Sequence, residues 1–490
     1  MIGRKKLSVM MELRPCFDGF AGIPQETRVL FSSFHELSNI DPIGLILHPS
    51  RRLARAAPRR EGPSIQRLNR VGRMIISSEE SEAATPVDRL RMQTERSREI
   101  LSLLATTGSN ARLKGSPIDT ADFADYFWQR LFSKGLGPAE MDLVRQARYV
   151  AIRPSWLSLH SMGATRRYPL MDTSGMDVFV AHTPWPTRVS PSTQLVIRYH
   201  DAIPVFHPHQ IKYPSMHHQH HYRALMSNAP TAVFACVSEA TRSDLLKLVP
   251  EAEDRSTVIP TSVSSVFHPE PEDPTIVADV IRSYLQGGKA PSQGSVGDGL
   301  PYLLMVSTIE PRKNHVRLLE AWEWVRRKLP DLKLVVVGSL GWNHGPILQK
   351  MKKWKQRGDL FHLSNVPTAD LRLLYSNASA AVCPSVAEGF DMSGIEAMMC
   401  ATPVIASDIP VHRENYGEAA LYFNPYSTDD LAKTINYLIS GGTWHDRRAG
   451  LTHAGLVRVK DFGRGELAQQ WGEFFEDLEA GKYGQSPGRR

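Results

Sequence analysis

The stretch Ala381–Ile409, AVCPSVAEGFDMSGIEAMMCATPVIASDI, decides the fold of this chain. It predicts a buried strand that ends at Cys383, a polar turn, a helix over Met392–Cys400 and a second apolar strand over Pro403–Ala406. Two parallel strands joined by a helix bind ligands at the carboxyl ends of the strands. We therefore expect an α/β fold with a ligand site at this edge of a parallel sheet.

Two carboxylates belong to this stretch: Glu388 lies in the turn and Glu396 in the helix. A lone helix glutamate is commonly a solvated surface charge. Ile395 and Met398 flank Glu396, however, so its carboxylate is expected at the edge of a packed helix, where it needs a partner such as a bound hydroxyl group. Gly389 and the free N–H groups at the helix start favour anionic or hydroxyl-rich ligands.

The C-terminal part of the chain alternates apolar strands with amphipathic helices, which predicts a parallel sheet covered on both faces. Besides the opening stretch, we expect strands at 302–306, 332–338, 360–363 and 419–423, and helices at 315–328, 346–355, 428–439 and 464–478.

Two adjacent cations follow the first of these strands, in the sequence Ser307-Thr-Ile-Glu-Pro-Arg-Lys-Asn314. Arg312 can fork onto two phosphate oxygens and Lys313 supplies a compact charge, so the pair suits a diphosphate group beside a helix start. Such a pair alone usually faces solvent, but its place on the same sheet edge as Glu388 favours a phosphate site. Gly338–Trp342 closes the next strand with a tight turn.

The N-terminal part opens with a strand over Leu7–Arg14, a turn containing Gly19 and Gly22, and a helix over 25–37. This order is typical of the first unit of a Rossmann-like domain, although turn formation alone explains the two glycines equally well. A later apolar strand, 194–199, ends in His200-Asp201 at the functional edge of the sheet. A histidine that closes a strand is often only structural.

These motifs together resemble the retaining glycosyltransferases of family 4, in particular their mannosyltransferase-like group. The resemblance rests on Glu388 and Glu396 with seven residues between them, on Glu310-Pro-Arg-Lys-Asn314, on His200-Asp-Ala-Ile-Pro204 and on Thr402–Asp408. It implies a GT-B fold, in which two Rossmann-like domains face each other across a central cleft. The chain departs from the family pattern at Asp391-Met-Ser393, where Gly-Leu-Pro is common, and at Pro24, where another glycine is common.

The resemblance also implies roles for residues. The catalytic residues would be His200, Arg312, Lys313 and Glu388. Donor binding would involve Gly338, Trp342, Glu388, Gly389, Phe390, Asp391, Met392 and Glu396, with Glu396 on the nucleotide ribose and Glu388 on the transferred sugar. Gly19, Gly22 and Asp201 would lie on the acceptor side. The departing phosphate would take the acceptor's proton, so the resemblance implies no separate base, no metal and no cofactor.

The substrates implied by the resemblance are a nucleotide sugar, with GDP-mannose favoured, and a glycan or lipid-linked glycan acceptor in surface polysaccharide or glycoconjugate synthesis. Residues 1–270 would form the acceptor-side domain with an arginine-rich insertion at about 50–120, and 271–300, rich in Gly and Ser, a linker. Residues 301–463 would bind the nucleotide sugar, and 464–490 would comprise a helix that crosses back and a basic tail.

Composition indicates a globular protein of the cytoplasm. Hydrophobic residues make up 42% and charged residues 22% of the chain, as in ordinary globular proteins. No apolar run approaches the roughly 20 residues needed to span a bilayer, and the apolar start is too short for a secretory signal. Four scattered cysteines suit a reducing compartment rather than a disulfide or zinc framework.

The whole chain has a net charge of +7, and the segment Arg51–Arg73, with eight arginines and one glutamate, alone carries a charge of the same size. Such a segment can be a solvated insertion or can bind nucleic acid, anionic lipid or a phosphate-bearing acceptor. Without interleaved aromatic residues, nucleic acid is disfavoured. We expect peripheral contact with an anionic membrane at the inner face if the acceptor is lipid-linked.

Other interpretations stay open at this stage. The run His217–His221 could chelate a metal, but a polar helix face is favoured because no carboxylate or cysteine completes the set. The whole chain could be a nucleotide-sugar epimerase of similar architecture, a phosphorylase, or a non-catalytic subunit. A phosphorylase is disfavoured because no lysine of this chain stands out as a candidate for a Schiff base with pyridoxal phosphate. A non-catalytic subunit is disfavoured because it has no need for two cations and two acids on one edge of the sheet.

Overall fold

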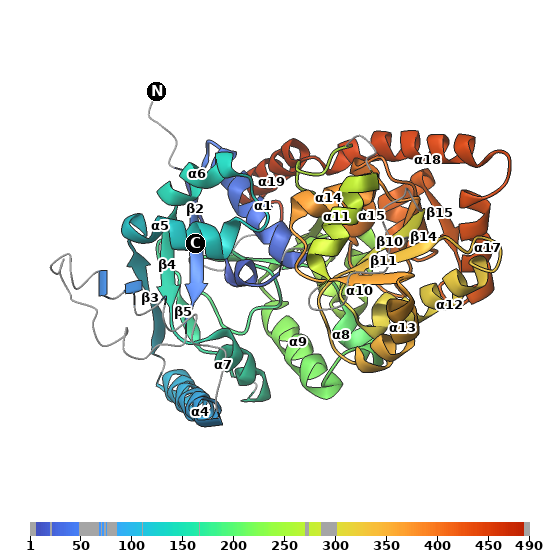
Figure 1. Cartoon of the computed structure of the whole chain (residues 1–490). Coiled ribbons are helices and arrows are strands. Elements are labelled where there is room, and N and C mark those ends of the chain that lie inside the picture. Colours follow the sequence, from blue (N-terminus) through green and yellow to red (C-terminus); the bar gives the residue numbers. More distant parts are fainter. Residues whose placement is uncertain are drawn as a thin grey trace.

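The computed structural model contains two α/β domains side by side, each built on its own sheet (Figure 1). The structure describes residues 6–19, 22–48, 68–69, 71–72, 75, 86–109, 111–165, 167–269, 274–285 and 301–484.

The first domain has a sheet of nine strands in the order β5-β3-β4-β2-β1-β6-β7-β8-β9. The strands are β1 Leu7–Glu12, β2 Ile40–Leu47, β3 Arg112–Ile118, β4 Arg148–Ile152, β5 Leu170–Asp172, β6 Val178–Ala181, β7 Gln194–Tyr199, β8 Val233–Cys236 and β9 Ser256–Val258. Neighbouring strands β1, β6 and β7 are parallel, so their carboxyl ends lie at one edge of the sheet.

The second domain has a sheet of six parallel strands in the order β12-β11-β10-β13-β14-β15. The strands are β10 Tyr302–Val306, β11 Lys333–Val337, β12 Leu360–Leu363, β13 Ala380–Cys383, β14 Val404–Ser407 and β15 Ala420–Phe423. This confirms the parallel sheet predicted from the alternation of apolar strands and amphipathic helices.

Helices cover the sheets. Those that follow strands of the first sheet are α1 Ile23–Glu36, α4 Pro86–Gly108, α5 Ala124–Phe127, α6 Met141–Gln146, α7 Trp156–Ser161, α8 Ile203–Phe206, α9 Pro214–Asn228 and α10 Glu239–Leu248. The others are α11 Pro274–Tyr284, α12 His315–Val325, α13 Gly345–Arg357, α14 Thr368–Ser376, α15 Met392–Met399, α16 Pro410–Tyr416, α17 Thr428–Ile439, α18 Trp444–Arg458 and α19 Arg464–Glu479.

The last helix, α19, crosses from the second domain back to the first, where it lies beside α1 (Figure 1). Trp471, Phe474 and Phe475 are buried in the core of the first domain. The ring of Phe34 on α1 packs edge-on against Trp471 at 5.2 Å between centroids. Burial of three large aromatic side chains ties the two domains together, because each contributes substantial apolar area.

Two segments differ from the sequence-based expectation. The predicted linker 271–300 contains the helix α11, whose Val277 and Ile281 are buried against the second core. The helix was not predicted because the Gly- and Ser-rich residues that follow it dominate the segment. The apolar residues Val277 and Ile281, four positions apart, were the signal of a helix. Within the predicted insertion 50–120, β3 is part of the main sheet and pairs antiparallel with β4. The segment Arg51–Arg73 lies almost wholly outside the described residues.

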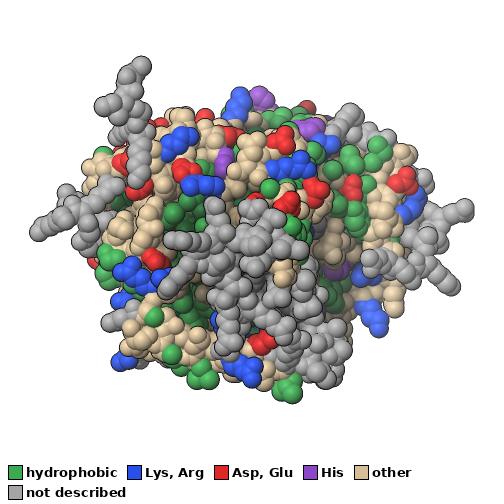
Figure 2. Space-filling model, turned by 90° about the vertical axis from the view of Figure 1, so that its left-hand side faces the viewer, with side chains coloured by type: hydrophobic (Ala, Val, Ile, Leu, Met, Phe, Trp, Pro, Cys, Tyr) green, Lys and Arg blue, Asp and Glu red, His purple; other side chains and the backbone are tan. Residues whose placement is uncertain are grey.

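The distribution of charged side chains on the surface and the burial of the cysteines, among the described residues, are those of a globular protein. Figure 2 shows the side of the first domain, where basic and acidic side chains are interspersed over the described part of that face. All four cysteines are buried and free. Among the residues that the structure describes, no helix is both long and apolar enough to cross a bilayer.

Candidate active site

The loop after β10 positions the two predicted phosphate-binding cations. A short 3-10 helix, Pro311–Lys313, ends at Asn314, whose φ of 61° redirects the chain into α12. The Asn314 side chain donates hydrogen bonds to the backbone oxygens of Pro384 and Pro425, at 3.0 and 2.9 Å. The cation loop is thus fastened to the loops that follow β13 and β15.

Arg312 and Lys313 converge on Glu388, as predicted. The Nη1 atom of Arg312 donates to Oε2 of Glu388 at 2.7 Å, and Nζ of Lys313 donates to Oε1 at 2.5 Å. Arg312 also pairs with the buried carboxylate of Glu310 at 2.9 Å. Charged donors to a carboxylate make strong hydrogen bonds, so this cluster is rigid and highly charged.

Burial and charge oppose each other at this cluster. Burial acts to raise the pKa of Glu388, but Arg312 and Lys313 outweigh it and hold the pKa below its usual range. Burial acts to lower the pKa of Arg312, and Glu388 and Glu310 outweigh it, so that this pKa is raised. Glu388 and Arg312 therefore stay ionised at neutral pH.

The first domain meets this cluster through His200 and Asp201. A Cβ atom added to Gly389 would lie 1.8 Å from the backbone oxygen of His200, so the two loops are in direct contact. The hydroxyl groups of Ser238 and Thr241 both donate to the backbone oxygen of Gly389, at 2.8 and 3.1 Å. Gly389 is therefore one point at which the second domain touches the strand-end loops of the first.

Asp201 lies within electrostatic reach of the cations. Burial raises the pKa of its carboxyl group, and Arg312 and Lys313 oppose this effect. Its Oδ1 atom accepts a hydrogen bond from the backbone N–H of Ile203 at 2.9 Å. Asp201 thus shapes the loop after β7 and faces the cation cluster from the other domain.

Glu396 does not contact Arg312 or Lys313. Its carboxyl group accepts a hydrogen bond from the Tyr375 hydroxyl at 3.0 Å and is almost fully buried. Burial raises its pKa to about 8, against hydrogen bonds from Tyr375 and from Gln25 of α1. The second acid of the predicted pair is thus enclosed between helices of both domains.

Asp391 forms the N-cap of α15. Its Oδ1 accepts from the N–H of Ser393, and Oδ2 accepts from His412 Nε2 at 2.9 Å. Burial acts to raise its pKa, but the hydrogen bond and charge of His412 hold the pKa well below its usual range. The neighbours Phe390 and Met392 are buried in the second core. The charge of Asp391, the residue at which the chain departs from the family pattern, therefore has partners within the protein.

Two other predicted donor-side residues close the loop after β11. A Cβ atom at Gly338 would lie 1.9 Å from the backbone oxygen of Ser307, so only glycine fits there. Trp342 donates its indole N–H to the backbone oxygen of Gln210, in the first domain, at 2.6 Å. This is a second direct contact between the domains.

The predicted acceptor-side turn follows β1. Arg28 is fully buried and donates from Nη2 to the backbone oxygens of Cys16, Asp18 and Gly19 at 2.8–2.9 Å. Gly22 has a φ of 71°, which favours glycine. The two residues between these glycines lie outside the described residues.

Sequence reasoning missed three polar side chains behind His200. Glu26 on α1 pairs with the fully buried Arg198 and with His200, and His182 contacts His200. His182 directly follows β6, just as His200 directly follows β7, and this shared strand-end position was the available signal. The sequence offered no comparable signal for Arg198, because this residue lies within an otherwise apolar strand.

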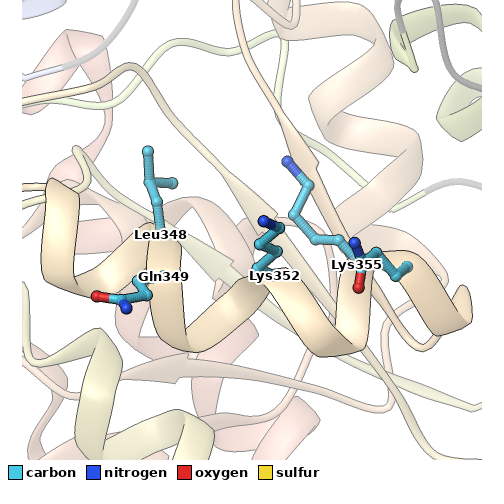
Figure 3. A pocket seen from close by; sticks show the side chains of 5 residues that line it. Leu348, Gln349, Lys352 and Lys355 are labelled. Atoms are coloured by element: carbon cyan, nitrogen blue, oxygen red, sulfur yellow. The ribbon is translucent and has the colours of Figure 1, made fainter.

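The histidine run on α9 and a surface hollow on α13 lie apart from the cation cluster. His221 hydrogen-bonds Tyr199 at 3.1 Å, and no group of three or more potential metal ligands occurs in the described ranges. Figure 3 shows a shallow hollow on the outer side of α13, lined by Leu348, Gln349, Lys352, Lys355 and Gln356. All of its lining comes from one surface helix.

Solved structures identify the class of fold. The structure is similar to sucrose-phosphate synthase from Thermosynechococcus elongatus, with a TM-score of 0.59 and 15% identity, over 97% of this chain and 100% of that one. It is also similar to Anabaena HepE in complex with UDP-glucose, with a TM-score of 0.56 and 13% identity, over 96% and 100%. At such identities the likeness shows the fold alone, which is GT-B, as predicted.

The sequence comparisons agree with this fold class. Residues 289–454, which include the cation cluster and the acid pair, match the family described as glycosyl transferases group 1. Serotype-specific mannosyltransferase WbdA of Escherichia coli is 33% identical over 206 residues, 41% of this chain and 24% of WbdA. O-antigen chain mannosyltransferase B of Escherichia coli is 30% identical over 230 residues, 46% of this chain and 55% of that protein. The chain thus spans about a quarter to half the length of these relatives.

Proposed function

We propose that this protein is a retaining, metal-independent glycosyltransferase that moves mannose from GDP-mannose to a hydroxyl group of a glycan or lipid-linked glycan. The product would be part of a surface polysaccharide or glycoconjugate. The mannosyltransferases among its relatives support the choice of sugar, and the group 1 family match supports the reaction class.

The observation that carries the proposal is the sharing of one buried carboxylate, Glu388, by Arg312 and Lys313 at the carboxyl edge of the second sheet. When a diphosphate enters, its oxygens replace Glu388 as partners of the two cations. Glu388 is then free to accept a hydrogen bond from a hydroxyl group of the transferred sugar. The same three side chains thus bind both ends of the scissile bond.

The reaction breaks the bond between the sugar's anomeric carbon and the diphosphate oxygen. It forms a bond from the anomeric carbon to the acceptor oxygen, on the same face of the sugar. The acceptor's proton passes to the departing phosphate oxygen. Arg312 and Lys313 stabilise the negative charge that develops on that oxygen, and a preorganised donor of this kind is typically worth about 100- to 1000-fold in rate. Because two fixed cations supply this charge, a metal ion is not needed.

The remaining site residues complete the assignment. Glu396 would hold the ribose hydroxyls, which requires α1 to withdraw Gln25 from the carboxyl group. His200 and Asp201 would approach the transferred sugar from the first domain. We place the enzyme in the cytoplasm, with peripheral contact to the inner face of the membrane through Arg51–Arg73.

The test is transfer itself. The purified protein is incubated with GDP-mannose, UDP-glucose or UDP-N-acetylglucosamine, with and without p-nitrophenyl α-mannoside, in EDTA. The expected result is consumption of GDP-mannose only when acceptor is present, with an α-linked product by NMR. Donor epimerisation without acceptor would instead identify an epimerase. A β-linked product, or activity abolished by EDTA, would contradict the retaining or metal-independent assignment.

A further inference from the structure

A chain of buried polar groups runs through the carboxyl edge of the first sheet. Arg198, fully buried on β7, donates to Oε1 of Glu26 from Nε and Nη2 at 2.7 and 2.6 Å. The other oxygen of Glu26 lies 3.3 Å from Nδ1 of His200. The Nε2 atom of His200 lies 3.4 Å from Nδ1 of His182. These polar contacts therefore lead from Arg198 through Glu26 and His200 to His182.

The two imidazole rings meet edge to edge. Their planes differ by only 19°, and their centroids are 5.6 Å apart, much farther than the two facing nitrogen atoms. This is the geometry of a nitrogen-to-nitrogen hydrogen bond between nearly coplanar rings rather than of face-to-face packing. Each ring can therefore donate or accept along this line.

The chemistry of the groups fixes the direction of every hydrogen. Arginine is always charged, so Glu26 beside it is a carboxylate and only accepts. His200 must therefore carry its hydrogen on Nδ1. Burial lowers the pKa of His182 to about 3 and that of His200 well below its ordinary value, so both rings are neutral. The Nε2 atom of His200 is then an acceptor, and Nδ1 of His182 must be the donor.

This assignment leaves one nitrogen lone pair without a partner, at the His182 end of this series of hydrogen-bonded groups. The Nε2 atom of His182 carries no hydrogen, is buried, and has no hydrogen-bond partner among the described residues. Leaving a buried acceptor unpaired is unfavourable, and such atoms in native proteins usually serve a ligand or solvent. A lone pair repels phosphate and carboxylate groups, so the partner that fits is a neutral hydroxyl group.

We propose that Nε2 of His182 accepts a hydrogen bond from a hydroxyl group of the acceptor sugar, and that His182 is a binding residue of the acceptor subsite. The inference rests on the proposed function. β6, which His182 follows, lies between β1 and β7 in the sheet. His182 is thus flanked by the glycine turn after β1 and by His200 after β7, all in the first domain. The cations and acids for the donor lie on the second sheet.

Two substitutions separate ligand binding from mere support of His200. In His182→Asn the amide occupies the place of Nδ1, so it keeps a donor to His200 but offers no acceptor at the position of Nε2. In His182→Gln the amide reaches the position of Nε2, so it keeps an acceptor for the hydroxyl group but loses the bond to His200. A ligand-binding role and a supporting role therefore predict opposite orders.

The experiment measures the Kd of methyl α-D-mannopyranoside by saturation-transfer NMR in the presence of saturating GDP, for the wild type and both variants. We expect His182→Asn to raise this Kd about tenfold and His182→Gln to keep it within about threefold, as for loss of one neutral hydrogen bond. Circular dichroism and the Kd of GDP should be unchanged in both. The Kd of GDP reports the second domain and serves as the internal control.

A His182→Asn variant that binds the glycoside like the wild type, or a wild type that does not bind it, would overturn the proposal. In the first case Nε2 of His182 hydrogen-bonds only solvent, and only His182→Gln would bind the glycoside more weakly than the wild type. The proposed function fails separately: the glycoside would bind in the expected order while GDP-mannose is not consumed. Transfer with an unaffected His182→Asn variant would leave the function intact and remove His182 from the site.

Discussion

Gly389 of the second domain lies against the backbone oxygen of His200 in the first, so closely that a Cβ atom would come within 1.8 Å of that oxygen. Backbone atoms on both sides make this contact, so no side chain can turn away to relieve a larger residue. The approach of the two domains over the cation cluster therefore depends on the absence of a side chain at one position.

Gly389→Ala should prevent this approach. Because a misplacement of about 1 Å in a reacting pair can reduce a rate by about 100-fold, we expect kcat/KM for transfer to fall by at least this factor. The variant should still bind GDP, because the proposed partners of its phosphates, Arg312 and Lys313, both belong to the second domain. Gly465→Ala on α19, where a Cβ atom meets nothing within 4 Å, is the matched control and should be fully active. Normal activity of Gly389→Ala would show that this contact is not required.

Lys313→Ala and Glu388→Ala should each strongly reduce transfer without unfolding the protein. In the proposed mechanism Lys313 stabilises the leaving phosphate, so its loss should reduce kcat by about 100- to 1000-fold. Glu388 remains paired with Arg312 when Lys313 is removed, which limits the loss of stability. Kinetics and the melting temperature measure the two effects. Lys352→Ala on the exposed side of α13 is the control for loss of one lysine; near-normal transfer by Lys313→Ala would refute the site assignment.

The cation cluster could be predicted from sequence because it depends on a topological rule. Arg312, Lys313 and Glu388 each follow a parallel strand, and the carboxyl ends of such strands share an edge. No side-chain packing needs to be known for this inference. The same rule located His200 and Asp201 at the matching edge of the first sheet.

What the sequence did not indicate depends on packing between segments distant in the chain. Asp391 could be recognised from the sequence only as a departure from the family pattern, because its partner His412 lies 21 residues further on, on another helix. Arg198 and Glu26 are 172 residues apart and form a buried pair that no local pattern announces. β3 pairs with β4 although its alternation of polar and apolar residues is weak. Each of these features requires knowledge of which helices and strands are neighbours.

Glu396 gives the protein a measurable dependence of stability on pH. Its pKa is raised to about 8, mainly by burial. The folded state thus binds this proton more tightly than the unfolded state, so the carboxyl group is tolerated at low pH and destabilises the fold as pH rises from its ordinary pKa toward about 8. Glu396→Gln is neutral at every pH and removes this effect.

Urea denaturation from about pH 5 to about pH 9 measures this prediction. The free energy of unfolding of Glu396→Gln minus that of the wild type should grow by up to about 1.4 kcal/mol per pH unit until about pH 8, and then stay constant. A difference that does not change with pH would show that the carboxyl group keeps its ordinary pKa in the folded state.

Glu414 on α16 should hold the domains together by capping a helix of the other domain. Its carboxylate oxygens accept from the backbone N–H groups of Glu239 and Ala240, at 2.6 and 3.0 Å, in the first turn of α10. Glu414→Ala leaves these donors without their anionic partner, which should lower the free energy of unfolding by about 1 kcal/mol and reduce transfer. Urea denaturation and kinetics measure both, with the exposed Glu418→Ala as control. Since Glu414 and α10 belong to different domains, an unchanged variant would mean that the other inter-domain contacts, at Gly389 and Trp342, suffice to hold the two domains together.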